Sequence, residues 1–170
     1  MKNPTLLKEI LDYRGRDEMP DDFDTFWNKQ VAEVEVPQGY QLLEKDFQIA
    51  YATCYDLTFK SGNGGQIYAK LVVPKLSEKV PVLFHFHGYM GQGWDWADML
   101  AYTAAGWGVV SMDVRGQSGY SLDGNREVRG NTVKGHIIRG ALDGPDQLFF
   151  KDVYLDVYTL VELVAGLDFV

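Results

Sequence analysis

One stretch of about thirty residues constrains the fold of this 170-residue chain more than any other. Residues 80–86 read Val-Pro-Val-Leu-Phe-His-Phe, a nearly continuous apolar run that is typical of a strand covered on both faces. A helical stretch from about Trp94 to Ala105 follows, and Gly106 ends it. Residues 108–112 then form a second buried strand. Strand, helix and strand in this order predict one βαβ unit with parallel strands and a right-handed crossover.

The segments on either side of this unit also have clear periodicity. Apolar residues alternate with polar ones in two stretches before it, which predicts two strands joined at residues 61–65, Ser-Gly-Asn-Gly-Gly. The alternating residues are Tyr55, Leu57 and Phe59, then Ile67, Ala69, Leu71 and Val73. After it, apolar residues recur at helical spacing up to Gly166 and predict a helix with one face toward the core. They are Phe150, Val153, Tyr154, Val157, Leu160, Val161 and Val164.

The two remaining stretches are less regular. Residues 1–40 are expected to be a peripheral helical segment, in which residues 20–22 (Pro-Asp-Asp) offer a cap. Phe23, Phe26, Trp27 and Val31 then share one helical face. Residues 113–145 carry many Gly, Asp, Asn and Arg residues with little periodicity, and a loop of that length inside a domain is usually functional. Residues 41–170 are expected to supply the first strands and helices of a sheet.

Composition narrows the class of protein. The formal net charge of −8 argues against nucleic acid or an anionic membrane as a partner, because both would repel the chain. A single cysteine, Cys54, excludes a disulfide within the chain and a Cys-rich metal site, and it lies in an alternating stretch where a plain strand residue is expected. Neither a signal peptide nor a run of about 18 apolar residues is visible. We therefore expect a soluble, intracellular protein.

In open α/β sheets, ligands bind outside the carboxyl ends of the strands. The first such end here is the turn that contains His87, Gly88 and Tyr89. A His-Gly turn after a buried strand has the form of an oxyanion-hole loop, in which fixed amide dipoles stabilise the negative charge of a tetrahedral intermediate. Gly88 lets the backbone approach closely, and the N–H of Tyr89 is the expected donor. An ordinary strand-to-helix turn with a buried histidine explains the same residues, and both readings stay open.

A second motif lies after the next strand. Residues 116–120, Gly-Gln-Ser-Gly-Tyr, nearly match the nucleophile elbow Gly-x-Ser-x-Gly. The elbow turns directly into a helix, whereas no helical periodicity begins here. We therefore do not expect Ser118 to be the nucleophile.

The other polar residues near these ends have structural interpretations. His85 is expected to be a core histidine and His87 a hydrogen-bonding residue of the turn. His136 has the chemistry of a general base, but nothing in the sequence pairs it with a nucleophile. Asp113 and Arg115 are expected to brace the long loop with hydrogen bonds. The spacing of the three histidines does not indicate a metal site.

Four segments in the same order resemble the family of acetyl xylan esterases and cephalosporin-C deacetylases, which are carbohydrate acetyl esterases of the α/β-hydrolase fold. The resemblance runs along essentially the whole chain. It is carried by residues 13–15 with 20–27 (Phe-Asp-Thr-Phe-Trp at their end), 85–89 with Gly91, Trp94, Asp95 and Trp96, 112–119, and 135–140. Each segment alone is weak evidence, but four in this order are specific.

The resemblance implies a three-layer α/β-hydrolase with a mostly parallel sheet, of which residues 1–170 are the amino-terminal portion of a single domain. It implies a serine esterase that removes acetyl groups from carbohydrates or cephalosporin-type esters, without a metal or other cofactor. It also implies a cytoplasmic homo-oligomer, a hexamer. Tyr89, through its backbone N–H, is the one catalytic position that carries over, with Gly88 beside it in substrate binding.

The departure from the family pattern is large. The nucleophilic serine would come shortly after residue 170, and the aspartate and histidine of the triad later still, so we expect this chain alone to be inactive. Two alternatives remain. In the first, the chain is a non-catalytic remnant that acts through oligomer contacts. In the second, it belongs to a related α/β-hydrolase such as a peptidase or a dienelactone hydrolase. The second alternative leaves the Phe-Asp-x-Phe-Trp signature unexplained.

Overall fold

The computed structural model describes residues 4–124 and 138–170, in two compact units: Met1–Glu33 and Val34–Val170. The first unit contains two helices, α1 (Pro4–Asp12) and α2 (Phe23–Ala32). As predicted, α2 begins directly after Asp22, whose carbonyl accepts a hydrogen bond of 2.8 Å from the N–H of Phe26. The side chain of Asp22 makes no capping bond. Among the described residues, no helix is both long enough and apolar enough to cross a membrane.

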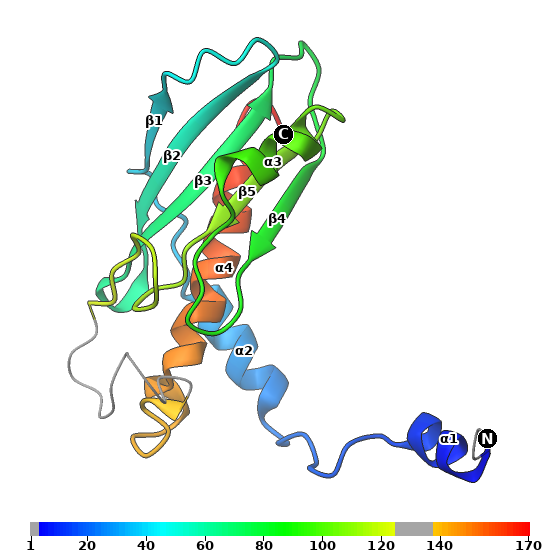
Figure 1. Ribbon diagram of the computed structural model, residues 1–170. Coiled ribbons are helices and arrows are strands. Elements are labelled where there is room, and N and C mark those ends of the chain that lie inside the picture. The colour runs from blue at the N-terminus through cyan, green and yellow to red at the C-terminus, as the bar shows by residue number, and fades with distance from the viewer. Residues whose placement is uncertain (1–3, 125–137) are drawn as a thin grey trace. The chain divides into compact units, whose positions relative to one another are not determined.

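The second unit is built on a five-stranded sheet with the order β1-β2-β3-β5-β4 (Figure 1). The strands are β1 (Gln41–Lys45), β2 (Ala52–Lys60), β3 (Gln66–Pro74), β4 (Val82–Phe86) and β5 (Gly108–Met112). β4 and β5 run parallel, as the βαβ pattern predicts, and helix α3 (Trp96–Thr103) lies between them in the chain. The other three pairings are antiparallel, so the described part of the sheet is mixed and not mostly parallel.

The hairpin between β2 and β3 is confirmed. The two strands pair over their whole length, from Ala52 opposite Pro74 to Lys60 opposite Gln66. The connecting turn contains a short 3₁₀ segment, η1 (Gly62–Gly64), in which Asn63 has a φ of 52°. A left-handed backbone is tolerated by Asn and Gly, which is why this composition predicts a tight turn.

The expectation that residues 80–86 form a strand covered on both faces is wrong in one respect. β4 begins after Pro81, where the missing N–H is not needed, but Val82 to His85 are only half-buried and Phe86 is exposed. The reason is the position of β4 at the end of the strand order, where it pairs with β5 alone among the described strands. β5, which has a neighbour on each side, is buried at all five positions.

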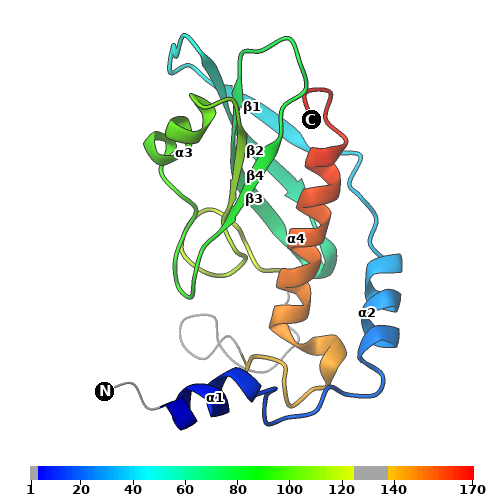
Figure 2. The same ribbon diagram turned by 90° about the vertical axis from the view of Figure 1, so that its right-hand side faces the viewer.

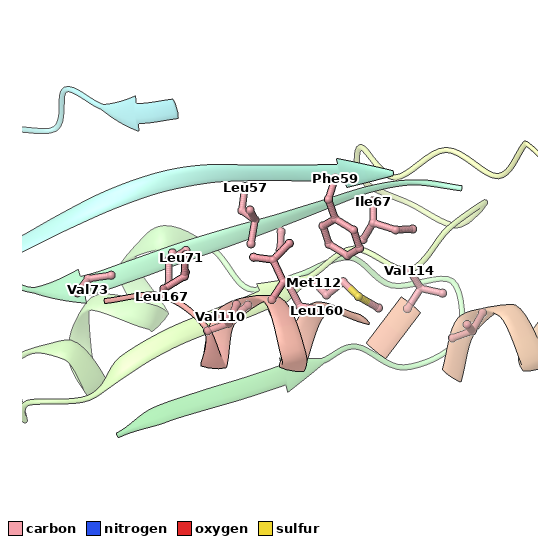
Figure 3. Close-up of a cluster of buried hydrophobic side chains, with 14 of the residues drawn as sticks. Leu57, Phe59, Ile67, Leu71, Val73, Val110, Met112, Val114, Leu160 and Leu167 are labelled. Atoms are coloured by element: carbon pink, nitrogen blue, oxygen red, sulfur yellow. The ribbon is translucent and has the colours of Figure 1, made fainter. Parts of the chain in front are cut away.

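Helices α3 and α4 (Phe149–Ala165) cover opposite faces of the sheet, which makes three layers (Figure 2). Side chains of β2, β3 and β5 meet those of α4 in the larger core, which includes Leu57, Leu71, Met112 and Leu160 (Figure 3). A smaller core lies against α3 and includes Cys54, Val109 and Met99. Cys54 is thus a buried strand residue, as expected, and burial raises the pKa of its thiol.

Helix α4 follows the predicted pattern with one exception. It ends at Ala165 with Gly166 as its cap, and Val153, Leu160 and Val164 face the core. Tyr154, which the sequence also places on the core face, is 56% exposed. The buried positions follow the spacing of three and four from Val153, and a residue next to that stripe is turned by about 100° around the helix.

Candidate active site

The turn that follows β4 lies at the carboxyl ends of the two parallel strands. Phe86, the last residue of β4, is level with Met112, the last residue of β5. Gly88 and Tyr89 are exposed on this turn, and a Cβ at Gly88 would have no atom within 4 Å apart from those of its two neighbours in the chain. Tyr89 is 51% exposed. The two residues predicted to meet a substrate are therefore accessible at the edge where α/β sheets bind their ligands.

His87 closes this turn through both ring nitrogens. The N–H of Val114 donates to Nε2 at 2.9 Å, so the ring proton is on Nδ1, which donates to the Gly88 carbonyl at 2.8 Å. The same carbonyl accepts the N–H of Gly91 at 2.9 Å. The predicted role of His87 as a hydrogen-bonding residue of the turn is confirmed, and neither nitrogen is directed to a reacting group.

Met90, the residue after Tyr89, has the uncommon φ of 57° for a side chain of its size. Two side chains from the loop after β5 hold it there. Gln117 accepts the N–H of Met90 on its Oε1 at 2.6 Å, and Ser118 donates its hydroxyl to the Met90 carbonyl at 3.1 Å. We call these two bonds the Met90 clamp. The sequence does not predict the Met90 clamp, because no periodicity pairs residues 27 positions apart.

The Met90 clamp also explains the near-match to a nucleophile elbow. Ser118 is exposed, and no helix begins within the described residues 116–124. Its hydroxyl is a donor to backbone and is not positioned at a helix N-terminus, as the elbow requires. Ser118 thus contributes to the shape of the turn.

Asp113 binds both the segment after β4 and the loop after β5. One carboxylate oxygen accepts the N–H of Gly93 at 2.7 Å and the other accepts the N–H of Tyr120 at 2.8 Å. Asp113 is 2% exposed. Gly119 has a φ of 97°, and a Cβ there would collide with the Asp113 carboxylate. The expected bracing role of Asp113 is confirmed.

Arg115 braces the loop from the other side of the sheet. Its guanidinium makes a bidentate pair with Asp156 of α4, at 2.6 Å from Nε and 2.5 Å from Nη2, and donates to the Gly62 carbonyl at 2.9 Å. Both side chains of the pair are fully buried. Burial alone would lower the pKa of Arg115, but the carboxylate of Asp156 outweighs it and raises that pKa, so the guanidinium stays charged. Arg115 therefore joins the loop, the β2–β3 turn and α4.

His85 lies beside the smaller core, against Trp94. Its Nδ1 shares a hydrogen bond of 2.8 Å with the hydroxyl of Ser111, and its ring stacks on Trp94 at a centroid distance of 3.9 Å. Burial and the neighbouring His87 lower the pKa of His85. The predicted hydrogen-bond partner of His85 is present, but the ring is only half-buried, so the prediction of a core residue is wrong in this respect. His136 lies outside the described residues.

The chain is similar to one known protein family, both in sequence and in structure. The sequence profile described as acetyl xylan esterase (AXE1) matches residues 1–170. The chain belongs to the acetyl xylan esterase family. Acetyl xylan esterase 1 from Thermoanaerobacterium sp. JW/SL YS485 is similar at 43% identity and a TM-score of 0.89, over 96% of this chain and 52% of that one. The acetyl xylan esterase from Paenibacillus sp. R4 is similar at 27% identity and a TM-score of 0.84, over 96% and 53%. No curated protein matched.

The chain therefore spans about half the length of these two acetyl xylan esterases. The predicted α/β-hydrolase fold is confirmed, with the mixed sheet described above. Within residues 4–124 and 138–170, no group of three or more His, Cys, Asp or Glu side chains is arranged to hold a metal ion. At the strand ends, this member of the family has a turn held by several hydrogen bonds that presents Gly88 and Tyr89.

Proposed function

We propose that residues 1–170 are the amino-terminal portion of a single α/β-hydrolase domain, with residues 1–40 as a peripheral helical segment and 41–170 as the first part of the sheet. In this proposal the chain supplies one arm of the oxyanion hole of an acetyl esterase, the backbone N–H of Tyr89. The observation that carries it is the turn itself: accessible at Gly88 and Tyr89, and held by His87 and by the Met90 clamp.

The chemistry required of this turn is limited and specific. A serine oxygen attacks the acetyl carbonyl carbon, the carbonyl π pair moves to oxygen, and the alcohol then leaves with a proton to give an acetyl-enzyme, which water hydrolyses. Each tetrahedral intermediate places a negative charge on the former carbonyl oxygen. A donor that is already fixed in place stabilises that charge without reorganising, and this contribution amounts to about 10²–10³ in kcat.

The remaining parts of the proposal rest on the family. The serine, aspartate and histidine of the triad belong to a segment outside these 170 residues. The substrates are acetyl esters of carbohydrates, such as acetylated xylo-oligosaccharides, and cephalosporin-type small esters. The active form is a cytoplasmic homo-oligomer, a hexamer.

The experiment uses a chimera in which residues 1–170 replace the matching segment of the Thermoanaerobacterium esterase, here called the chimeric esterase. We expect it to hydrolyse an aryl acetate, whereas the 170-residue chain alone does not. Ser118→Ala in the chimeric esterase should lower kcat at most about tenfold and not abolish it, because Ser118 is a positioning residue for the turn and not the nucleophile. Serine-dependent turnover by the 170-residue chain, abolished by Ser118→Ala, would contradict the proposal.

A further inference from the structure

A pocket of about 770 Å³ opens on the α3 face of the sheet, over strands β1 to β3. Three parts of the chain line it: strands β1 to β3, the segment 92–96, and the loop after β5. Asp113, which bonds Gly93 of the turn, and Gln92 belong to its lining. The volume is in the range of pockets that hold small ligands. Tyr89 and Gly88 are not part of its lining, so the pocket is a separate feature.

The floor of the pocket is a hydrogen-bonded group of three side chains. Asp56 accepts the ammonium of Lys45 at 3.0 Å on one oxygen and the hydroxyl of Tyr68 at 2.6 Å on the other. The three come from neighbouring strands, with Asp56 and Tyr68 on β2 and β3. A carboxylate has about four acceptor sites, so Asp56 retains capacity for a ligand hydroxyl.

Aromatic rings stand beside this floor. Tyr120 is 73% exposed and meets Tyr68 edge-on at a centroid distance of 5.1 Å. Trp96 is held edge-on by Phe47 at 5.4 Å. An aromatic face is electron-rich and apolar, and it packs well against the C–H face of a ring whose edge carries hydroxyl groups.

The charges of the pocket favour a neutral ligand. Its lining contains two lysines and three aspartates, and most of these side chains already bind other groups of the chain. Lys45 pairs with Asp56, and Lys70 donates to the Trp94 carbonyl at 2.7 Å. Asp113 accepts two backbone N–H groups. A phosphate or other anion would find no spare cation in this lining, since both lysines have partners.

We infer that this pocket binds one ring of a neutral oligosaccharide, with the ring's C–H face on Tyr120 and its hydroxyls over Asp56 and Lys45. The inference deepens and rests on the proposed function, because an esterase that acts on carbohydrates meets sugar units other than the acetylated one, and Asp113 joins the pocket lining to the segment that follows the turn. A single pyranose ring fits the volume with room for part of a neighbour.

The test is calorimetric titration of the 170-residue chain with unacetylated xylotetraose, which contains no ester and so requires no catalysis. We expect saturable binding, weakened at least about tenfold by Tyr120→Ala and retained by Tyr120→Trp, which keeps an aromatic face. The matched control is Tyr158→Ala, which removes an exposed tyrosine from α4, remote from this lining. Thermal unfolding of each variant verifies that the fold is intact.

Two outcomes overturn the inference. One is the absence of binding by a folded chain, and the other is binding that Tyr120→Ala leaves unchanged. The proposed function fails differently, through a folded chimeric esterase that hydrolyses no acetate. Hydrolysis without xylotetraose binding would retain the proposed function and reject the sugar pocket.

Discussion

Oε1 of Gln117 accepts a hydrogen bond of 2.6 Å from the backbone N–H of Met90, next to the amide that we propose as an oxyanion donor. The backbone of Met90 has a positive φ of 57°. This left-handed conformation costs a non-glycine residue about 1–2 kcal/mol, which contacts with the surroundings must offset. The bond from Gln117 is one of the two that impose it. The precision of the turn therefore depends on a side chain that lies in another loop.

Removal of this acceptor should affect the rate more than the fold. In the chimeric esterase, Gln117→Ala is expected to lower kcat about tenfold with a smaller change in KM, because a misplaced donor is lost mainly from the transition state. Steady-state hydrolysis of an aryl acetate gives both constants. Gln38→Ala, at an exposed position outside the turn, is the control and should match the parent. If Gln117→Ala and Gln38→Ala lowered kcat equally, Gln117 would have no specific role in positioning the turn.

A comparison of two glycines distinguishes folding from substrate approach. Gly119→Ala places a Cβ against the Asp113 carboxylate at a φ of 97°, so it should lower the free energy of unfolding by about 1–3 kcal/mol. Gly88→Ala meets no atom within 4 Å and should leave that free energy nearly unchanged. In the chimeric esterase, however, Gly88→Ala should reduce kcat/KM, since the methyl group occupies space that we assign to the substrate. Urea unfolding and kinetics measure the two effects, and unchanged kinetics for Gly88→Ala would contradict the assignment.

The buried pair of Arg115 and Asp156 should dominate the stability of the loop. Arg115→Met leaves the Asp156 carboxyl buried without its cation, and we expect a loss of about 3–5 kcal/mol in the free energy of unfolding. The double variant Arg115→Met, Asp156→Leu should recover much of this loss, because it also removes the unpaired carboxyl. Arg16→Ala, in the exposed pair with Asp17, should produce no measurable change. A double variant as unstable as Arg115→Met would show that the unpaired Asp156 carboxyl is not the source of the loss, since Arg115 also lies near the buried carboxylates of Asp123 and Asp152.

The pH dependence of stability has a component from His85. The folded state lowers the pKa of His85 from its ordinary value of 6.5, because its ring is partly buried and lies near His87. The neutral form is therefore the one that favours folding: its contribution is complete above pH 6.5 and is lost as the pH falls below that value. His85→Phe, which keeps a ring against Trp94, should show a shallower decline in urea midpoint on acidification. Parallel declines in parent and variant would assign the effect to other groups.

The parts of the structure that local periodicity determines could be predicted from sequence. The buried run of residues 108–112 predicts β5, and the spacing of three and four in α4 predicts its buried stripe. Strand β1 was missed because Leu42 and Leu43 are adjacent, so its short run has no alternation. Local sequence patterns cannot predict contacts between side chains that lie far apart in the chain.

The candidate site depends on such contacts. Asp156 lies on the buried stripe of a helix, where a charged residue is unexpected until Arg115 is placed against it. The Met90 clamp likewise joins two loops, and its residues Gln117 and Ser118 resemble part of another motif. The sequence predicted the turn and its location, but not what holds it in shape.

The most direct test of the account is the kcat of the chimeric esterase with Tyr89 replaced in two ways. Tyr89→Phe keeps the backbone N–H and is expected to retain kcat within about threefold. Tyr89→Pro removes that N–H and should lower kcat by about 10²–10³, with thermal unfolding used to verify the fold. A folded Tyr89→Pro variant with the kcat of the parent would contradict the central claim that this amide stabilises the oxyanion.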